Sequence, residues 1–359
     1  MTPSTRGAAR SGRVRSARLT DLAALGDLSR RSHLTDVDGS AGPDDGVHVR
    51  SLGLPVSSGH IGFFSLFRLP LGAFQPHDRL YVYEERGRVH GLARVEHDAR
   101  RSESTVVELD SLDRPGAGDV RFRLVQHLMK DGSKSGTARY HVACSDRGGN
   151  VDLFMQAGFA RYGEEVILYR PSDQPLPPAM TADEAAASNI RPSVPLDALR
   201  LDQLYRSVTP VPVSRLEAYR LNDWEQQGSH WRVPRSALTP ILRFADVEAF
   251  IQLESPAADA RALAFLQVGV AKAEQPHYLR VLSRPEHDPS ALIRFGMGII
   301  GPRNQRSDHG LVSAVRTYES PLDRRLEEQG FVPIARVTLL LKETAVRVAE
   351  PALVPVTSR

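Results

Sequence analysis

A short stretch after residue 107 combines residue types that could move a proton and hold an anion. Glu108 carries a carboxylate of the kind that serves as a general base, and the run Arg114-Pro-Gly-Ala-Gly118 follows within one loop. Glycine lets the backbone approach a ligand closely, and N–H groups at a helix start favour an anion. Asp119 follows, where it would cap a helix, so the same run also fits an ordinary turn. Both interpretations stay open at this point.

Three further glycines, Gly296, Gly298 and Gly301, match the G-x-G-x-x-G spacing of dinucleotide-binding proteins. That motif requires a strand before the first glycine and a helix that opens within the motif. The preceding residues 290–295 instead resemble the first turns of a helix. We therefore predict that these glycines lie inside or at the end of a helix, closely packed against a sheet.

The elements that would position these residues are predicted twice along the chain. An L-x-x-L-x-R-P run begins at Leu109 and another begins at Leu279. Each run is followed by a helical pattern, a strand, a second helix and a Gly-Phe pair, at Gly158 and Gly330. A period of about 170 residues has the size of a domain and is too long for a solenoid repeat. The sequence therefore predicts two copies of one fold.

A proline-rich stretch separates the two copies, and prolines resist both helix and sheet. We predict a disordered basic tail at 1–13, an N-terminal domain at 14–170 and a linker at 171–189. A C-terminal domain at 190–348 and a frayed tail at 349–359 complete the chain.

Hydrophobic periodicity assigns the elements within each copy. In the first copy it predicts strands at 80–83, 89–95, 104–109, 138–143 and 161–170, and helices at 119–129 and 150–156. In the second copy it predicts strands at 249–253, 261–271, 277–282, 310–318 and 332–342, and helices at 196–205, 290–300 and 321–329. The stretches 36–78 and 207–240 have few periodic signals and are predicted to be long, variable segments.

Composition excludes several classes of function. The 359 residues carry 46 basic and 43 acidic side chains, a net charge of +3 that is too balanced to indicate nucleic-acid binding. Cys144 is the single cysteine, so an intrachain disulfide and a cysteine-based metal site are excluded, and we predict no metal site of another kind. The sequence has no run of about 18 apolar residues, so we predict no membrane span. We expect a cytoplasmic protein whose oligomeric state the sequence leaves open.

The order of elements resembles that of the GCN5-related N-acetyltransferases. The stretch from Val107 to Pro115, with its loop and helix, is similar to the family's pyrophosphate-loop motif. The segments that end at Gly158-Phe159 and Gly330-Phe331 are similar to the end of its later helix. The resemblance implies an α/β fold of two tandem domains. Each would be a mostly antiparallel mixed sheet, flanked by helices, with splayed central strands.

The resemblance also implies a co-substrate and a reaction. Acetyl-coenzyme A would lie between two strands that a bulge splays apart, with its pyrophosphate at a helix start. An acceptor amine would then attack the thioester directly, which makes the chain an acyl-CoA-dependent N-acyltransferase. The cofactor contacts that the resemblance places on this sequence are Leu109, Ser111, Leu112, Arg114, Gly116, Ala117 and Gly118.

The resemblance further implies a base and an acid for the reaction. Glu108 occupies the strand position where the family often has a glutamate base, and Asp110 is an alternative. The family often has a tyrosine acid four residues before the Gly-Phe glycine, but this chain has Phe154 and Leu326 there. Tyr140 or a water molecule would then protonate the leaving thiolate.

The two copies differ in their loops, so the resemblance implies unequal roles. The second loop, 284–290, has no glycine and two carboxylates that would repel a pyrophosphate. We therefore expect the first half to hold acetyl-coenzyme A and the second half to shape the site of a small-molecule or peptide amine acceptor. Trp224, Trp231 and Tyr219 would form either a wall of that site or a separate core. The alternative is a catalytically inactive protein of this fold that senses a ligand or binds a partner.

Overall fold

The structure is a computed structural model that describes residues 12–21, 23–25, 47–49, 52, 55–57, 78–112, 117–146, 149–225, 233–272, 275–303 and 310–344. The strands of the first half are β1 (Arg13–Ser16), β2 (Val47–Val49), β3 (Pro55–Ser57), β4 (Asp78–Glu85), β5 (Arg88–Asp98), β6 (Glu103–Ser111), β7 (Arg139–Cys144) and β8 (Ala160–Arg170). Its described helices are α3 (Ala117–Lys134) and α4 (Asn150–Gln156), together with the 3₁₀ turn Leu19–Asp21.

The second half repeats this order of elements. Its strands are β9 (Ile190–Pro192), β10 (Phe244–Leu253), β11 (Ala262–Ala271), β12 (His277–Ser283), β13 (Leu311–Arg316) and β14 (Val332–Glu343). Its helices are α5 (Ala182–Ala187), α6 (Ala198–Val208), α7 (Val211–Glu217), α8 (Leu221–Trp224), α9 (Ser290–Arg303) and α10 (Leu322–Glu327). The 3₁₀ turns Pro195–Asp197 and Thr317–Glu319 lie between them.

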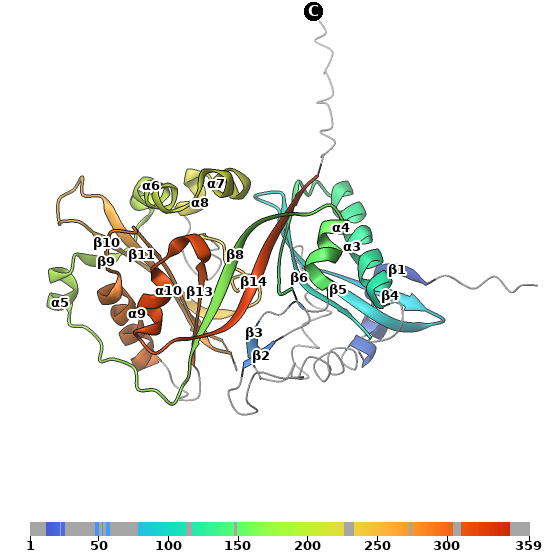
Figure 1. The fold of residues 1–359 in the computed structure, drawn as a ribbon, viewed down its shortest axis with the longest axis horizontal. Coiled ribbons are helices and arrows are strands. Elements are labelled where there is room, and N and C mark those ends of the chain that lie inside the picture. The colour runs from blue at the N-terminus through green and yellow to red at the C-terminus, as the bar shows by residue number, and fades with distance from the viewer. Residues whose placement is uncertain are drawn as a thin grey trace, which may run out of the picture.

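Twelve of these strands form one continuous sheet, in the order β1-β4-β5-β6-β7-β14-β8-β13-β12-β11-β10-β9. Within this sheet β6 pairs with β7 in parallel and β12 pairs with β13 in parallel, while the other neighbouring strands are antiparallel. Helices flank the sheet in both halves (Figure 1). The predicted fold class, a mostly antiparallel mixed sheet flanked by helices, is therefore confirmed.

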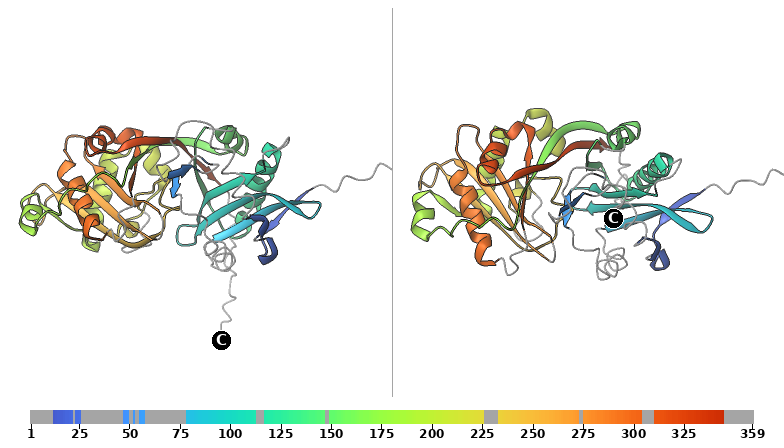
Figure 2. Two further views of the ribbon diagram at one scale, coloured as in Figure 1. Left: turned by 90° about the horizontal axis from the view of Figure 1, so that it is seen from below. Right: turned by 60° about the horizontal axis from the view of Figure 1, so that its bottom comes forward.

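The two halves exchange their last strands. β8, from the first half, pairs with β13 and β14, and β14, from the second half, pairs with β7 and β8. Figure 1 shows the green β8 beside the red β14 between the two halves, and Figure 2 shows the same pair bridging them from two further directions. Each half therefore depends on the other to complete its sheet.

Different helices cover the two halves of the sheet. In the first half α3 packs on β4, β5 and β6, and its Leu124 and Val125 are fully buried. In the second half α9 packs on β11 and β12, and α6 contacts the same two strands. Leu279 packs with α9 in one apolar cluster and Leu282 packs with α6 in another, so helices cover both faces of the sheet there.

Local details confirm that the two halves are copies of one pattern. Gly158 after α4 has a φ of +86°, and Gly330 after α10 has a φ of +85°. Such left-handed values favour glycine, because a Cβ atom is strained there. Phe159 and Phe331, which follow, are buried in the two halves' cores. The Gly-Phe pairs thus end equivalent helices and anchor equivalent strands.

The same correspondence appears at the first strand of each half. Arg15 Nη1 lies 2.6 Å from Asp21 Oδ2, and Arg191 Nη1 lies 2.7 Å from Asp197 Oδ2. In both places the second carboxylate oxygen accepts from the arginine's Nη2. The repeat therefore extends to an ion pair that fastens each first strand to the turn after it.

The G-x-G-x-x-G glycines lie inside helix α9, as predicted. A Cβ atom on Gly296 would come within 2.6 Å of Leu266, and one on Gly298 would come within 2.9 Å of the Ala179 backbone. These glycines therefore allow the helix to pack closely. Within the described ranges, none of the helices is long and apolar enough to cross a membrane.

Candidate active site

In the first half, β6 and β7 stop pairing part of the way along their length, and the space between them beyond this point is called the gap. The pairing of β6 with β5 shifts by one residue between Arg94 and Val95, which leaves Val107 as an extra residue in β6. The parallel ladder between β6 and β7 ends at the same level, at the pair Val106 and Val142. A bulge bends its strand and increases the local twist. Beyond this point β6 continues along β5 while its ladder with β7 has ended.

The second half is built differently at the equivalent place. The ladder between β11 and β12 has no register shift, and the ladder between β12 and β13 ends one residue before Arg280. The Arg280 guanidinium reaches across to β13, where its Nη1 donates to the Ala314 carbonyl at 3.3 Å. It also forms a buried ion pair with Glu319. Arg280 thus bridges the two strands one residue beyond the end of their ladder, just as Val107 lies one residue beyond the end of the ladder between β6 and β7.

Glu108, the predicted base, directly follows the bulge. Its side chain is largely buried, and Arg94 Nε donates to its Oε2 at 3.3 Å. Asp110, the alternative base, lies two residues further on and therefore on the same face of the strand. Leu109, between them, is fully buried in the core that includes Val120 of α3. The two carboxylates therefore lie on the face of the sheet opposite α3.

The remaining predicted cofactor contacts lie at the end of β6 and at the start of α3. Ser111 ends β6, and the amide of Leu112 donates to the His90 carbonyl at 3.0 Å. Ala117 and Gly118 are the first residues of α3. The other two predicted contacts, Arg114 and Gly116, lie outside the described residues. Cofactor binding by these residues stays a prediction.

Tyr140 lies away from the gap. Its hydroxyl donates to the carbonyls of Leu128 and Met129 on α3, at 3.2 and 3.3 Å. Burial raises the pKa of the Tyr140 hydroxyl above its ordinary value. A Cβ atom on Gly132 would collide with this hydroxyl, so the helix packs directly onto it. The position favours a packing role for Tyr140 over a role as the acid.

A segment of the second half completes the first half's site. This bridging segment, residues 233–243, places Ala237, Leu238 and Ile241 in the same apolar core as Val106 and Val142. It leads into β10, and residues 233–243 themselves form neither a helix nor a strand. The core of the first half therefore includes side chains from the second.

Hydrogen bonds hold the bridging segment in place. The Ala237 amide donates to Glu165 Oε2 at 2.7 Å, and Arg316 Nη2 donates to the Arg235 carbonyl at 3.0 Å. The Arg235 amide donates to the Tyr219 hydroxyl at 2.7 Å. Of the aromatic residues predicted as a wall or a core, Tyr219 and Trp224 pack into the core under α6, and Trp231 lies outside the described residues.

Arg235 also reaches into the first half, where it joins a buried charge network. Its Nη2 lies 2.5 Å from Glu103 Oε2, and its Nη1 donates to Thr105 Oγ1 at 3.1 Å. Arg101 and Arg139 contact the same carboxylate at 3.1 and 3.4 Å. Burial opposes ionisation of Glu103, but hydrogen bonding and the surrounding arginines outweigh it and hold its pKa well below the usual range. Glu103 is therefore ionised and neutralised by its neighbours.

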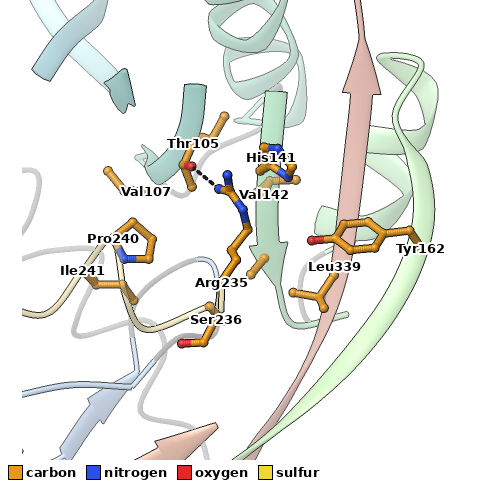
Figure 3. A pocket seen from close by; sticks show the side chains of 13 residues that line it. Thr105, Val107, His141, Val142, Tyr162, Arg235, Ser236, Pro240, Ile241 and Leu339 are labelled. Carbon is orange, nitrogen blue, oxygen red and sulfur yellow. Dashed lines mark hydrogen bonds between the residues drawn. The ribbon is translucent and has the colours of Figure 1, made fainter. Parts of the chain in front are cut away.

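A hollow lies beside this charge network and next to the bulge at Val107. It is lined by residues of β6, β7, β8, β14 and the bridging segment, among them Thr105, Val107, His141, Tyr162, Arg235 and Ile241 (Figure 3). Figure 3 shows the His141 ring near the Arg235 guanidinium and the Tyr162 hydroxyl directed toward the Leu339 side of the hollow. The hollow thus joins the bulge to polar groups from three separate parts of the chain.

His141 is the most buried ionisable group in this hollow, with 3% of its side chain exposed. Its Nε2 lies 3.5 Å from Glu103 Oε2. Burial and the charge of Arg235 lower the pKa of His141 to about 4, although Glu103 acts in the opposite direction. The imidazole is therefore neutral near pH 7.

Sequence reasoning did not select His141, Tyr162 or Arg235 as site residues. For His141 the sequence does contain one indication. Side chains alternate along a strand, so His141 is expected on the opposite face of the sheet from Tyr140. The other two residues lie on β8 and on the bridging segment, which the sequence does not connect to β6. Their contribution depends on the tertiary structure.

Among protein-family models and among curated proteins, none matches this chain. Among solved structures, a tandem GNAT protein from the clavulanic acid biosynthesis pathway is similar at 13% identity with a TM-score of 0.51, over 93% of this chain and 98% of that one. A GCN5-related N-acetyltransferase from Sphaerobacter thermophilus is similar at 15% identity with a TM-score of 0.52, over 92% and 95%.

The chain has the fold of a tandem GCN5-related N-acetyltransferase. The likeness spans nearly the whole chain, which agrees with the two copies seen in the sequence. In this tandem acetyltransferase fold, the bulge and the early end of the central ladder occur in the first half, and the Arg280 bridge occurs in the second. The predicted resemblance is thereby confirmed at the level of the fold.

Proposed function

We propose that the chain is an acyl-CoA-dependent N-acyltransferase that transfers an acetyl group from acetyl-coenzyme A to a primary amine. The observation that supports this proposal is the bulge at Val107, located where the ladder between β6 and β7 ends. The resemblance implies that a pantetheine arm lies between such strands. The second half has Arg280 across the equivalent strands, so we place the reaction in the first half.

The start of α3 is the proposed site for the pyrophosphate of the co-substrate. This helix has 18 residues and begins at Ala117 and Gly118, shortly after β6 ends. The first N–H groups of a helix have no partner within the helix, and its dipole favours negative charge there. Gly118 would leave room for the phosphates to approach the backbone.

Glu108 is the proposed base for the reaction. The amine nitrogen forms a bond to the thioester carbonyl carbon, the carbon–sulfur bond breaks, and the amine's proton passes to the Glu108 carboxylate. The coenzyme A thiolate leaves and takes a proton from water. Glu108 suits this role because it directly follows the bulge and lies on the face opposite α3, from which an acceptor can approach. General-base catalysis typically contributes about 10²–10⁴-fold to the rate.

The acceptor is proposed to be a small-molecule or peptide amine. It would enter on the face that carries Glu108 and Asp110, where the bridging segment from the second half supplies part of the wall. This arrangement supports the expected division of labour, in which the second half shapes the acceptor site.

One observation favours the alternative, a protein that binds the ligand without turnover. Phe154 and Leu326, which occupy the position of the family's tyrosine acid, are both fully buried in apolar cores. Neither side chain can donate a proton. A sensor would bind acetyl-coenzyme A in the same gap and release it unchanged.

Titration of acetyl-coenzyme A by calorimetry tests the proposal. We expect binding to the native chain, and we expect Val107→Phe to weaken the affinity at least about tenfold, because the larger ring would fill the gap. Val211→Phe, the same substitution at an exposed valine of α7 in the second half, is the control and should leave the affinity within about twofold. No binding at millimolar co-substrate would disprove the proposal. Binding without turnover on a panel of amines would favour the sensor.

A further inference from the structure

His141 is a buried polar side chain with a ring nitrogen that the described protein atoms leave unused. Nδ1 has no hydrogen-bond partner among the residues that the structure describes. Nε2 faces the Glu103 carboxylate, 3.5 Å from its Oε2. Because buried polar groups are almost always hydrogen-bonded, such a nitrogen indicates a missing partner. The hollow that His141 lines is the place where that partner would lie.

The charges around His141 determine which kind of partner fits. Glu103 faces it from β6, Arg235 from the bridging segment and Tyr162 from β8, while Arg139 shares its strand and Glu217 of α7 acts at longer range. Glu103 is already contacted by three arginines, so it has little negative charge left to stabilise an imidazolium. The ring therefore stays neutral, with one nitrogen that donates and one that accepts.

The position of Glu103 selects the tautomer. Its ionised carboxylate can only accept, so the proton of the neutral ring belongs on Nε2, which faces it. Nδ1 is then the hydrogen-bond acceptor. Tyr162 supplies the complementary group, because burial raises the pKa of its hydroxyl to about 12 and keeps it protonated as a donor.

The rest of the hollow is mainly apolar. Val107, Val142 and Ile241 line it beside His141 and Tyr162. The Arg235 guanidinium already donates hydrogen bonds to Glu103 and Thr105. The carboxylates of Glu103, Glu165 and Glu217 each have an arginine partner. These surroundings favour an uncharged hydroxyl group on a short aliphatic chain and disfavour a second ammonium group.

We propose that this hollow is an acceptor subsite that takes an uncharged hydroxyl group carried by the amine substrate, with His141 Nδ1 accepting its hydrogen bond and the Tyr162 hydroxyl donating one to it. The proposal rests on the proposed function, because it assigns a substrate class, short amino alcohols, to the same site. His141 is then a specificity-determining residue. A site built to bind a hydroxyl rejects the analogue that lacks it, since the buried partner is left unsatisfied.

A matched pair of amines tests this subsite. 4-Aminobutan-1-ol and pentylamine have the same number of heavy atoms and differ in a hydroxyl against a methyl group. We expect kcat/KM with acetyl-coenzyme A to favour the amino alcohol by at least about tenfold. In His141→Phe the preference should fall below about twofold. His277→Phe changes a buried histidine of β12 in the second half and is the control that should keep the preference.

A binding measurement makes the test independent of turnover and of the variants' folding. In the native chain, 4-aminobutan-1-ol should shift the NMR signal of the His141 ring, and pentylamine should shift it clearly less. Equal kcat/KM for the two amines, or a His141 signal that neither amine moves at 50-fold excess over the protein or more, would overturn the subsite. Acetyl-coenzyme A binding is measured separately, so loss of the subsite and loss of the proposed function give different results.

Discussion

Arg280 and Glu319 form an ion pair in which Nη2 lies 2.5 Å from Oε1 and 2% of each side chain is exposed. Glu319 also accepts from the Arg316 amide at 2.9 Å, and Arg280 donates to the Ala314 carbonyl. The pair therefore joins β12 to β13 and to the turn that follows β13. It lies beyond the end of the β12–β13 ladder, where the first half has the bulge at Val107 beyond the end of the β6–β7 ladder, so the two copies of one fold differ at this point.

Removal of Arg280 alone should destabilise the chain strongly. Arg280→Leu leaves the Glu319 carboxylate buried without its cation, so we expect the free energy of unfolding to fall by about 3–5 kcal/mol. The double variant Arg280→Met with Glu319→Leu should lose clearly less, because the buried charge is also gone. Urea denaturation of both variants measures the difference. An equal loss in the two variants would contradict this account of the pair.

The exchange of β8 and β14 predicts that the halves do not fold separately. A fragment of residues 1–181 lacks β14, which is the partner of both β7 and β8. We expect the full chain to unfold in one cooperative calorimetric transition, and neither 1–181 nor 182–359 to show a cooperative transition alone. Co-expression of both fragments is the positive control and should restore the transition. Two separate transitions in the full chain would rule out this interdependence.

Tyr140 can be tested as a packing residue against its predicted role as an acid. Tyr140→Phe removes the hydroxyl that donates to the α3 carbonyls, so we expect a loss of about 1 kcal/mol in the free energy of unfolding. The turnover number should stay within about twofold of the native value. A fall of a hundredfold or more in turnover with native stability would instead support the acid role.

The pKa of His141 predicts a pH dependence of stability. The folded pKa of about 4 lies below the ordinary value of 6.5, so the unfolded chain binds more protons between these values. The stability linked to this group is present above pH 6.5 and is lost as the pH falls toward 4, by roughly 3 kcal/mol in total. His141→Gln should show a shallower decrease in this window. The window from pH 6.5 to 4.5 is the informative one, since Glu103 contributes below it.

Arg235 offers a direct check on the cause of that pKa. Arg235→Met removes a positive charge that disfavours protonation of His141, so we expect the pKa of His141 to rise. An NMR titration of the ring signals measures this pKa. Arg303→Met changes an exposed arginine of α9 and is the control, with no expected effect. An unchanged pKa in Arg235→Met would mean that burial alone keeps the imidazole neutral.

Much of the element order follows from the sequence, because periodicity and turn motifs are local. The predicted helix at 150–156 has the bounds of α4, and the helix predicted at 290–300 is the larger part of α9. The Gly-Phe pairs ended equivalent helices, as the repeat indicated. The stretch predicted as a variable segment at 207–240 nevertheless contains α7 and α8, since helices this short are stabilised by the packing of residues such as Trp224.

The sequence by itself determined that two copies of an acetyltransferase-like pattern follow one another, and that the first copy carries the more suitable residues at Glu108 and Gly118. Only the tertiary structure decided which strands are neighbours. The exchange of β8 and β14, the bulge at Val107 and the Arg280 bridge all depend on pairing between distant segments. The hollow around His141 likewise needs Tyr162 and Arg235 from elsewhere in the chain. Such contacts are set by the packing of whole elements, whose register no local pattern specifies.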